Sequence, residues 1–389
     1  RTLVRGATIS SNGSLTTQNI SITGKYYNLT IPQTSIEGKA FTGKIYVTNH
    51  SCSTSEIPPA YITLLKAYGG KDNITELPDS AFANVTTAND KGMYKKADDL
   101  GTSYYYRGAV DNNWVKFGKE GDKDIYWRII RINGDGSIRM IYSGTTAPTE
   151  STKVVMTGTG TQINATTYAF NSSRNNPSYV GYMFTEGQQH GNGTPSTIKQ
   201  TIDNWYKTTT LETDATTKEL VSQDQIFCND RSATTSSSGT PGEISGSMST
   251  STTYYYGAYV RLVTNKSPQL KCPTASDKFT SRKSSIGNKA LTYPVGLITA
   301  DEVAMAGGVY GSSNTNSSYY LYTNQYYWSG SPSTFFSVNS DAFGFIVVSS
   351  GDLADADVSL NYGARPVVSL SSKAKLSGNG TYSKPYTVS

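Results

Sequence analysis

Two neighbouring runs of β-branched, aliphatic and aromatic residues constrain the fold of this chain more than any other feature. Residues 125–132 and 137–142 each have the composition of a strand, and the segment Asn133-Gly-Asp-Gly136 joins them. Glycine and asparagine between two such runs are typical of a β-hairpin. Shorter strand-like stretches recur along residues 319–370. We therefore expect a chain built mostly of short strands.

Three segments break the strand pattern and predict helices. Residues 60–68 should form a short helix, since a proline precedes them and two glycines follow. Residues 197–207 place apolar side chains along one helical stripe. Thr299 and Glu302 have the spacing of a capping box, and a helix should run from there to Gly307. Two main helices among many short strands indicate the α+β class.

The chain divides into three parts. Residues 1–58 alternate apolar and polar positions in short pieces, which predicts a small β module. Residues 59–100 contain the short helix and an extended strap, and residues 101–389 form the main domain. Arg1 does not resemble a native start, so we expect that a signal or anchor was removed. No apolar run approaches the roughly 18–20 residues of a membrane span.

Composition narrows the class of partner. Charged residues are 16% of the chain, but aromatic residues are 11% and include 29 tyrosines, which favours an ordered chain over a disordered one. The net charge is +5, from 34 basic and 29 acidic residues. Because the basic residues form no long run, we expect no nucleic-acid partner.

Three cysteines bear on the cellular location. They are Cys52, Cys228 and Cys272, and no two are close in sequence. With only two histidines, they cannot supply a structural zinc site. We expect a Cys228–Cys272 disulfide formed in an oxidising compartment, with Cys52 free or paired between chains. Three buried, reduced thiols are the alternative.

Seven segments of the main domain resemble secreted surface proteins of gut Firmicutes, a largely uncharacterised family. The resemblance covers roughly residues 60–389, in the expected order. It implies a C-type-lectin-like fold at residues 101–389, which is also the fold of formylglycine-generating enzymes and of variable receptor-binding proteins. The matching segments are residues 101–109, 126–136, 202–206, 227–230, 293–301, 327–332 and 363–368.

A lectin-like fold implies that ligands meet the loops near residues 326–332 and 339–362. Tyrosine, serine and asparagine there would give rigid contact area and adaptable hydrogen bonds. Of Tyr326 and Tyr327, one should point outward, since neighbouring strand residues alternate. Trp328 is expected in the core. The candidate ligand-binding residues are Tyr326, Tyr327, Ser329, Asn339, Asp341, Asp352, Asp355, Asp357, Asn361 and Tyr362.

The four aspartates among these candidates are the only local cluster of carboxylates. They could hold calcium, but their spacing matches no EF-hand loop and the sugar-binding tripeptides of calcium lectins are absent. We favour solvated loop acids over a calcium site and expect no other cofactor or metal.

Nothing in the sequence supplies a catalytic pair. Neither His50 nor His190 has a partner at a recognisable motif spacing, and His190 is expected in a solvated loop. Formylglycine-generating enzymes use two closely spaced cysteines, whereas Cys228 and Cys272 are widely separated. We therefore expect no enzyme activity.

Three functions remain as hypotheses. The first is an extracellular, cell-surface adhesin or ligand-binding protein that contacts a host glycan or surface protein through the C-terminal loops. The second is a structural subunit of a filament or pilus-like assembly, in which residues 1–58 pair with another copy of the chain. The third, an enzyme of the formylglycine-generating class, lacks the expected metal ligands.

Overall fold

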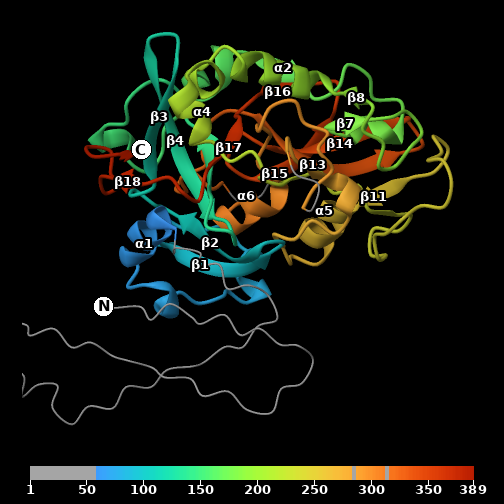
Figure 1. Ribbon diagram of the computed structural model, residues 1–389. Helices are drawn as coiled ribbons and strands as arrows, with labels where there is room; N and C mark the ends of the chain where they lie inside the picture. Colours follow the sequence, from blue (N-terminus) through green and yellow to red (C-terminus); the bar gives the residue numbers. More distant parts are fainter. Residues whose placement is uncertain (1–57, 283–285, 312–314) are drawn as a thin grey trace, which may run out of the picture. The chain divides into compact units, whose positions relative to one another are not determined.

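The computed structural model describes residues 58–282, 286–311 and 315–389 (Figure 1). The predicted β module at residues 1–58 therefore lies outside the described residues except for its last one, Pro58, and so does Cys52. The described part is a mixed structure of many short strands and a few helices, as predicted. Two curled sheets carry most of the strands.

The first sheet has eight strands and contains the predicted hairpin. Ile132 lies opposite Ile138 in an antiparallel pair, which confirms the prediction for residues 125–142. Its main path runs β1-β2-β4-β3-β19-β18, while β5 joins β4 to β17. The strands are β1 (Lys91–Asp98), β2 (Gly101–Gly108), β3 (Trp114–Glu120), β4 (Lys123–Ile132), β5 (Ile138–Tyr142), β17 (Val367–Leu370), β18 (Leu376–Ser377) and β19 (Tyr386–Val388).

The segment expected to be an extended strap is more structured than its sequence suggests. Two short 3-10 turns, Lys71–Asn73 and Asp79–Phe82, precede strand β1. β1 pairs along its whole length with β2, with Asp98 opposite Gly101. The boundary predicted at residue 100 therefore falls in the turn of a hairpin, and β1 forms an edge of the first sheet.

The second sheet has seven strands and carries most of the C-terminal segment. Its path is β10-β11-β13-β14-β15, and β16 pairs with both β13 and β6. The strands are β6 (Thr167–Ala169), β10 (Ala233–Thr234), β11 (Tyr254–Tyr256), β13 (Tyr327–Phe336), β14 (Asp341–Val347), β15 (Leu353–Asp357) and β16 (Asn361–Gly363). Two small ribbons complete the strands, β7 (Met183–Phe184) with β8 (Thr194–Pro195) and β9 (Phe227–Cys228) with β12 (Lys278–Phe279).

All three predicted helices are present. α1 (Pro59–Lys66) begins with its proline, and α2 (Thr197–Tyr206) is capped by Ser196, whose hydroxyl accepts from the Lys199 amide. α6 (Ala300–Ala306) has the predicted capping box between Thr299 and Glu302. Shorter helical segments are α3 (Thr210–Thr213), α4 (Ala215–Glu219) and α5 (Gly257–Tyr259), the last continuing into a π turn at Val260–Thr264.

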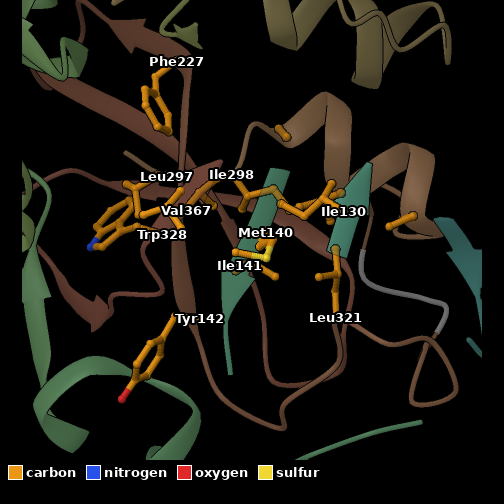
Figure 2. Close-up of a cluster of buried hydrophobic side chains, with 14 of the residues drawn as sticks. Ile130, Met140, Ile141, Tyr142, Phe227, Leu297, Ile298, Leu321, Trp328 and Val367 are labelled. Atoms are coloured by element: carbon orange, nitrogen blue, oxygen red, sulfur yellow. The ribbon is translucent and has the colours of Figure 1, made fainter. Parts of the chain in front are cut away.

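One apolar core joins the two sheets. Figure 2 shows Ile130 and Met140 of the first sheet in the same cluster as Trp328 of the second. Trp328 has no exposed area, which confirms its predicted place in the core.

The disulfide between Cys228 and Cys272 is present, as predicted. It closes a separation of 44 residues and ties β9 to the segment before β12. Closing a loop of this length lowers the conformational entropy of the unfolded chain, which stabilises the folded protein by about 4 kcal/mol.

Candidate functional site

Three of the ten predicted ligand-binding residues, Tyr327, Ser329 and Asp352, have fully buried side chains in the structure, so a ligand at the surface would not contact them. Tyr327 has no exposed area; its hydroxyl donates to the Leu321 carbonyl oxygen at 3.0 Å, and the Arg365 guanidinium lies over its ring. Ser329 is equally buried and donates to the Phe345 carbonyl oxygen at 2.9 Å. Both faces of this part of β13 are covered, which the alternation of its sequence does not reveal.

Tyr326 and Tyr362 meet at the surface. Their rings stack with centroids 5.4 Å apart and an angle of 23° between the planes. Tyr326 keeps 44% of its area exposed, so one of the two adjacent tyrosines does point outward, as expected. Tyr362 also packs edge-on against the buried Trp328, with centroids 5.2 Å apart. The exposed ring therefore rests on a second ring that the core holds in place.

A third tyrosine extends this surface. Tyr168 of β6 lies directly opposite Tyr362 of β16, and opposite residues of an antiparallel pair share a face. The Asn164 amide donates to the Tyr168 hydroxyl at 3.0 Å. Asn164 and Ala165 both have left-handed φ values, 55° and 49°, which is strained for alanine. We call Tyr168, Tyr326, Tyr362 and Asn164 the tyrosine platform.

Asn361 and Asn339 are exposed but do not belong to the platform. Asn361 precedes Tyr362 in β16, and successive strand residues point to opposite faces. Asn339 lies in the turn between β13 and β14, next to Val338, which is 92% exposed. The predicted ligand-binding residues therefore do not form one continuous surface.

Asp341 and Asp357 are paired with one arginine. Arg174 Nε lies 3.0 Å from Asp341 Oδ1, and the same guanidinium bonds Asp357. The other Asp357 oxygen accepts from the amide and hydroxyl of Ser359, each at 2.8 Å. Both aspartates are nearly buried, while the Arg174 side chain is 52% exposed. Their negative charge is largely compensated within the protein.

Asp355 has neutral partners instead. The Tyr310 hydroxyl donates to Asp355 Oδ1 and the Ser333 hydroxyl to Oδ2, each at 3.0 Å. The carboxylate is partly exposed. None of the ion pairs in the described part of the chain includes Asp355. Burial and the neighbouring Asp355 charge raise the pKa of Tyr310 above its ordinary value, which keeps its hydroxyl a donor.

Asp352 is fully buried and lies apart from the other aspartates. The Ser350 hydroxyl donates to its Oδ2 at 3.3 Å, and its Oδ1 has no hydrogen-bond partner. Burial raises the pKa of Asp352 to about 6. The four aspartates thus occupy three different environments. No group of three or more His, Cys, Asp or Glu side chains in the described ranges is arranged to hold a metal ion.

An aromatic surface that sequence reasoning missed lies beside Asp355. Consecutive rings contact one another with centroids 5.1–6.4 Å apart, and each ring is partly exposed. The rings come from β11, α5, the segment before residue 311, β13 and β14. We call them the aromatic rim: Tyr255, Tyr259, Tyr310, Phe336 and Phe343.

One local signal could have pointed to the rim. In the run Tyr254-Tyr255-Tyr256, strand alternation buries the outer two rings, which are 3% and 0% exposed, and turns Tyr255 outward. The contacts of Tyr255 with Tyr259 and Phe336 depend on the tertiary fold, and no sequence spacing encodes them.

A charged cleft elsewhere in the molecule is lined by paired side chains. Arg131 and Arg139 both bond Glu302, and Arg261 bonds both Asp230 and Asp301. The cleft encloses about 30 Å³, space for one or two water molecules, and a hollow of about 210 Å³ that shares Asp99, Leu100 and Ile226 adjoins it. These ion pairs are best explained as structural.

His190 differs from its predicted solvated state. Its Nδ1 lies 2.9 Å from the buried carboxylate of Asp277, and its Nε2 lies 3.1 Å from Glu243. Asp277 also accepts from the Arg231 guanidinium. The histidine therefore links its own loop to the segments that carry Asp277 and Glu243, and its side chain is only 13% exposed.

Comparison of the chain with protein-family models, curated proteins and solved structures gives no match. In the ranges that the structure describes, no helix has both the length and the apolar character needed to cross a membrane.

Proposed function

We propose that this chain is a non-enzymatic ligand-binding protein of the extracellular cell surface, and that the tyrosine platform binds a glycan. The observation that carries this proposal is the stacked pair of Tyr326 and Tyr362, with Tyr326 44% exposed. A C-type-lectin-like fold, with the adhesin role that it implies, is part of the same proposal.

The chemistry of the platform suits a sugar. The faces of aromatic rings pack against the C–H groups of a sugar ring, and tyrosine adds a polar tip. Tyr168 and Asn164 lie beside the rings with hydroxyl and amide groups that can hydrogen-bond sugar hydroxyls. The platform also carries no carboxylate or basic group, which favours a neutral glycan.

The platform needs little ordering before it binds. Tyr362 is paired in a sheet on one side and packed against Trp328 on the other. The Trp328 indole donates to the Tyr168 carbonyl oxygen at 2.7 Å, which links all three. Side chains that are held in place before binding lose less conformational entropy on binding.

The Cys228–Cys272 disulfide supports an extracellular location. Disulfides persist in oxidising compartments and are rare in the reducing cytosol. Peptide mapping of protein purified without reductant tests this point, and two free thiols at these positions would remove the argument.

Glycan-array binding tests the proposal. We expect the wild type to bind a set of neutral glycans, and Tyr326→Ala to weaken binding about tenfold, as is usual for a central aromatic contact. Tyr326→Phe should retain most of the affinity because it keeps the ring. Tyr382→Ala, at a partly exposed tyrosine of the turn between β18 and β19, is the matched control and should bind like the wild type. A broad array with no binding, or binding that Tyr326→Ala leaves unchanged, would overturn the proposal.

A further inference from the structure

The surface carboxylates of the second sheet differ in whether a basic side chain pairs with them. Asp341, Asp355 and Asp357 lie on β14 and β15, and the register of the two strands places them on one face. Arg174 pairs with Asp341 and Asp357. Asp355, two residues from Asp357, has no basic partner among the residues described. Arg174 thus neutralises two of these three negative charges, and no basic side chain in the described ranges neutralises the third.

The surroundings of Asp355 leave its charge available to a ligand. Tyr310 and Ser333 each donate one neutral hydrogen bond to it, and neither cancels the charge. Each carboxylate oxygen can accept more than one hydrogen bond. A partly buried carboxylate without a cation is costly, so a cation that reached this position would be favoured.

The rim already holds an ammonium group of the protein itself. Lys266 Nζ lies 6.0 Å from the centre of the Tyr310 ring, and it donates to the Tyr310 carbonyl oxygen at 3.3 Å. A cation over a tyrosine face gains about 0.5–2 kcal/mol. This ammonium bonds the backbone and makes no ion pair with Asp355. One ring of the rim thus already lies beside an amine of the protein, although burial lowers the pKa of Lys266.

From these contacts we infer that the aromatic rim with Asp355 is a second binding site, which takes the protonated amine of an amino sugar. The amine donates N–H groups to the free acceptor positions of Asp355. The partly exposed rings of Tyr255, Tyr259 and Phe336 extend the surface beyond the carboxylate and pack against the sugar ring.

Two features select this ligand among organic cations. A quaternary ammonium cannot donate a hydrogen bond, so it would use the rings but not the acceptors of Asp355. A lysine-rich protein partner carries many positive charges and would be opposed by the net charge of +5 of this chain. An amino sugar brings one charge and a ring with apolar faces.

This site is separate from the tyrosine platform and does not rest on it. Tyr326 directly precedes β13, whereas Ser333 and Phe336 lie near its other end. Tyr362 packs on Trp328, which lies opposite Ile346, whereas Asp355 lies opposite the neighbouring Phe345, and successive strand residues point to opposite faces of the sheet. In Figure 1, α5 and β11, which carry Tyr259 and Tyr255, lie beside β13. Either site can fail without the other.

Titration of the whole chain with small probes, followed by NMR or calorimetry, tests the inference. Glucosamine should bind in the millimolar range and perturb residues of the rim, whereas glucose should bind at least tenfold more weakly. Butylamine has the amine without the sugar ring, and choline has a quaternary ammonium. Both should bind several-fold more weakly than glucosamine.

Variants identify the carboxylate that is responsible. Asp355→Asn should weaken glucosamine binding at least tenfold, whereas Tyr310→Phe, which keeps the ring and frees one acceptor position of Asp355, should not weaken it. Asp124→Asn, an exposed carboxylate of the first sheet, makes the same change in net charge and should have no effect. A thermal melt of each variant establishes that it is folded.

The remaining outcomes contradict the inference. Equal affinities for glucose and glucosamine would mean that the positive charge of the amine does not contribute to binding. An affinity for choline equal to or higher than that for glucosamine would mean that the N–H donors of the amine do not contribute. Equal affinities for butylamine and glucosamine would mean that the sugar ring does not contribute to binding. Glucosamine binding that Asp355→Asn leaves intact, or no binding at all, would overturn the site.

Discussion

The two ends of β13 carry surfaces of opposite character. At the start of the strand, the tyrosine platform combines exposed rings with an amide and a hydroxyl and carries no charge. Near its other end, the aromatic rim surrounds Asp355, whose partners are neutral. The same sheet therefore offers one neutral and one negative surface. The rim keeps a negative charge because Arg174 pairs with Asp341 and Asp357 but not with Asp355.

The largest effect should come from removing the support beneath the platform. Trp328→Ala deletes a fully buried ring that Tyr362 and Phe170 contact. We expect a loss of about 3–5 kcal/mol in the free energy of unfolding, measured by urea denaturation. Tyr326→Ala, at the exposed ring, should cost less than about 1 kcal/mol. Equal costs for the two would mean that Tyr326 is part of the core and not a binding surface.

A second prediction compares two aspartates that lack a basic partner. Burial raises the pKa of Asp352 to about 6 from an ordinary value of 3.8. Between about pH 4 and pH 6 the folded protein therefore binds more protons at this residue than the unfolded chain. This group's contribution to stability falls as pH rises through that window, and its cost is complete above pH 6.

Asp352→Asn removes this cost. The variant should be more stable than the wild type by up to about 3 kcal/mol at pH 7 and by much less at pH 4, as measured by denaturation at both values. The corresponding variant of the partly exposed Asp355 should shift stability by less than about 1 kcal/mol at either pH. A gain for Asp352→Asn that does not depend on pH would show that its charge is not the cause.

The smallest effect should come from Arg174. Its side chain is 52% exposed, whereas the side chains of Asp341 and Asp357 are only 12% and 9% exposed; because water reaches the guanidinium side of both ion pairs, their contribution to stability is limited. Arg174→Gln should lower the free energy of unfolding by at most about 1 kcal/mol, and less in high salt, because screening weakens the lost attraction. A loss above about 2 kcal/mol would mean that Arg174 holds the end of the sheet together and is more than a compensating charge.

Local sequence signals predicted the local structure well. The hairpin of β4 and β5 follows from turn residues between two strand-like runs, and the cap of α6 follows from the spacing of Thr299 and Glu302. In both cases the determining atoms are close in sequence. The Cys228–Cys272 pairing followed from counting cysteines in a chain with few of them.

The candidate site was harder to predict because it is assembled over long distances. Tyr255 and Phe336 are 81 residues apart, yet their rings meet because β11 pairs with β13. The burial of Tyr327 and Ser329 depends on what covers β13, which strand alternation does not specify. The separation of the aspartates likewise depends on Arg174, which is more than 160 residues away in sequence.

The most direct test of this account is one NMR experiment on isotope-labelled protein with two ligands, a neutral glycan selected from the array and glucosamine. We predict that the neutral glycan perturbs signals of Tyr168, Tyr326 and Tyr362, while glucosamine perturbs those around Asp355, and that each still binds when the other is present. Competition for one set of residues, or no perturbation at either surface, would contradict the claim that β13 carries two separate binding sites.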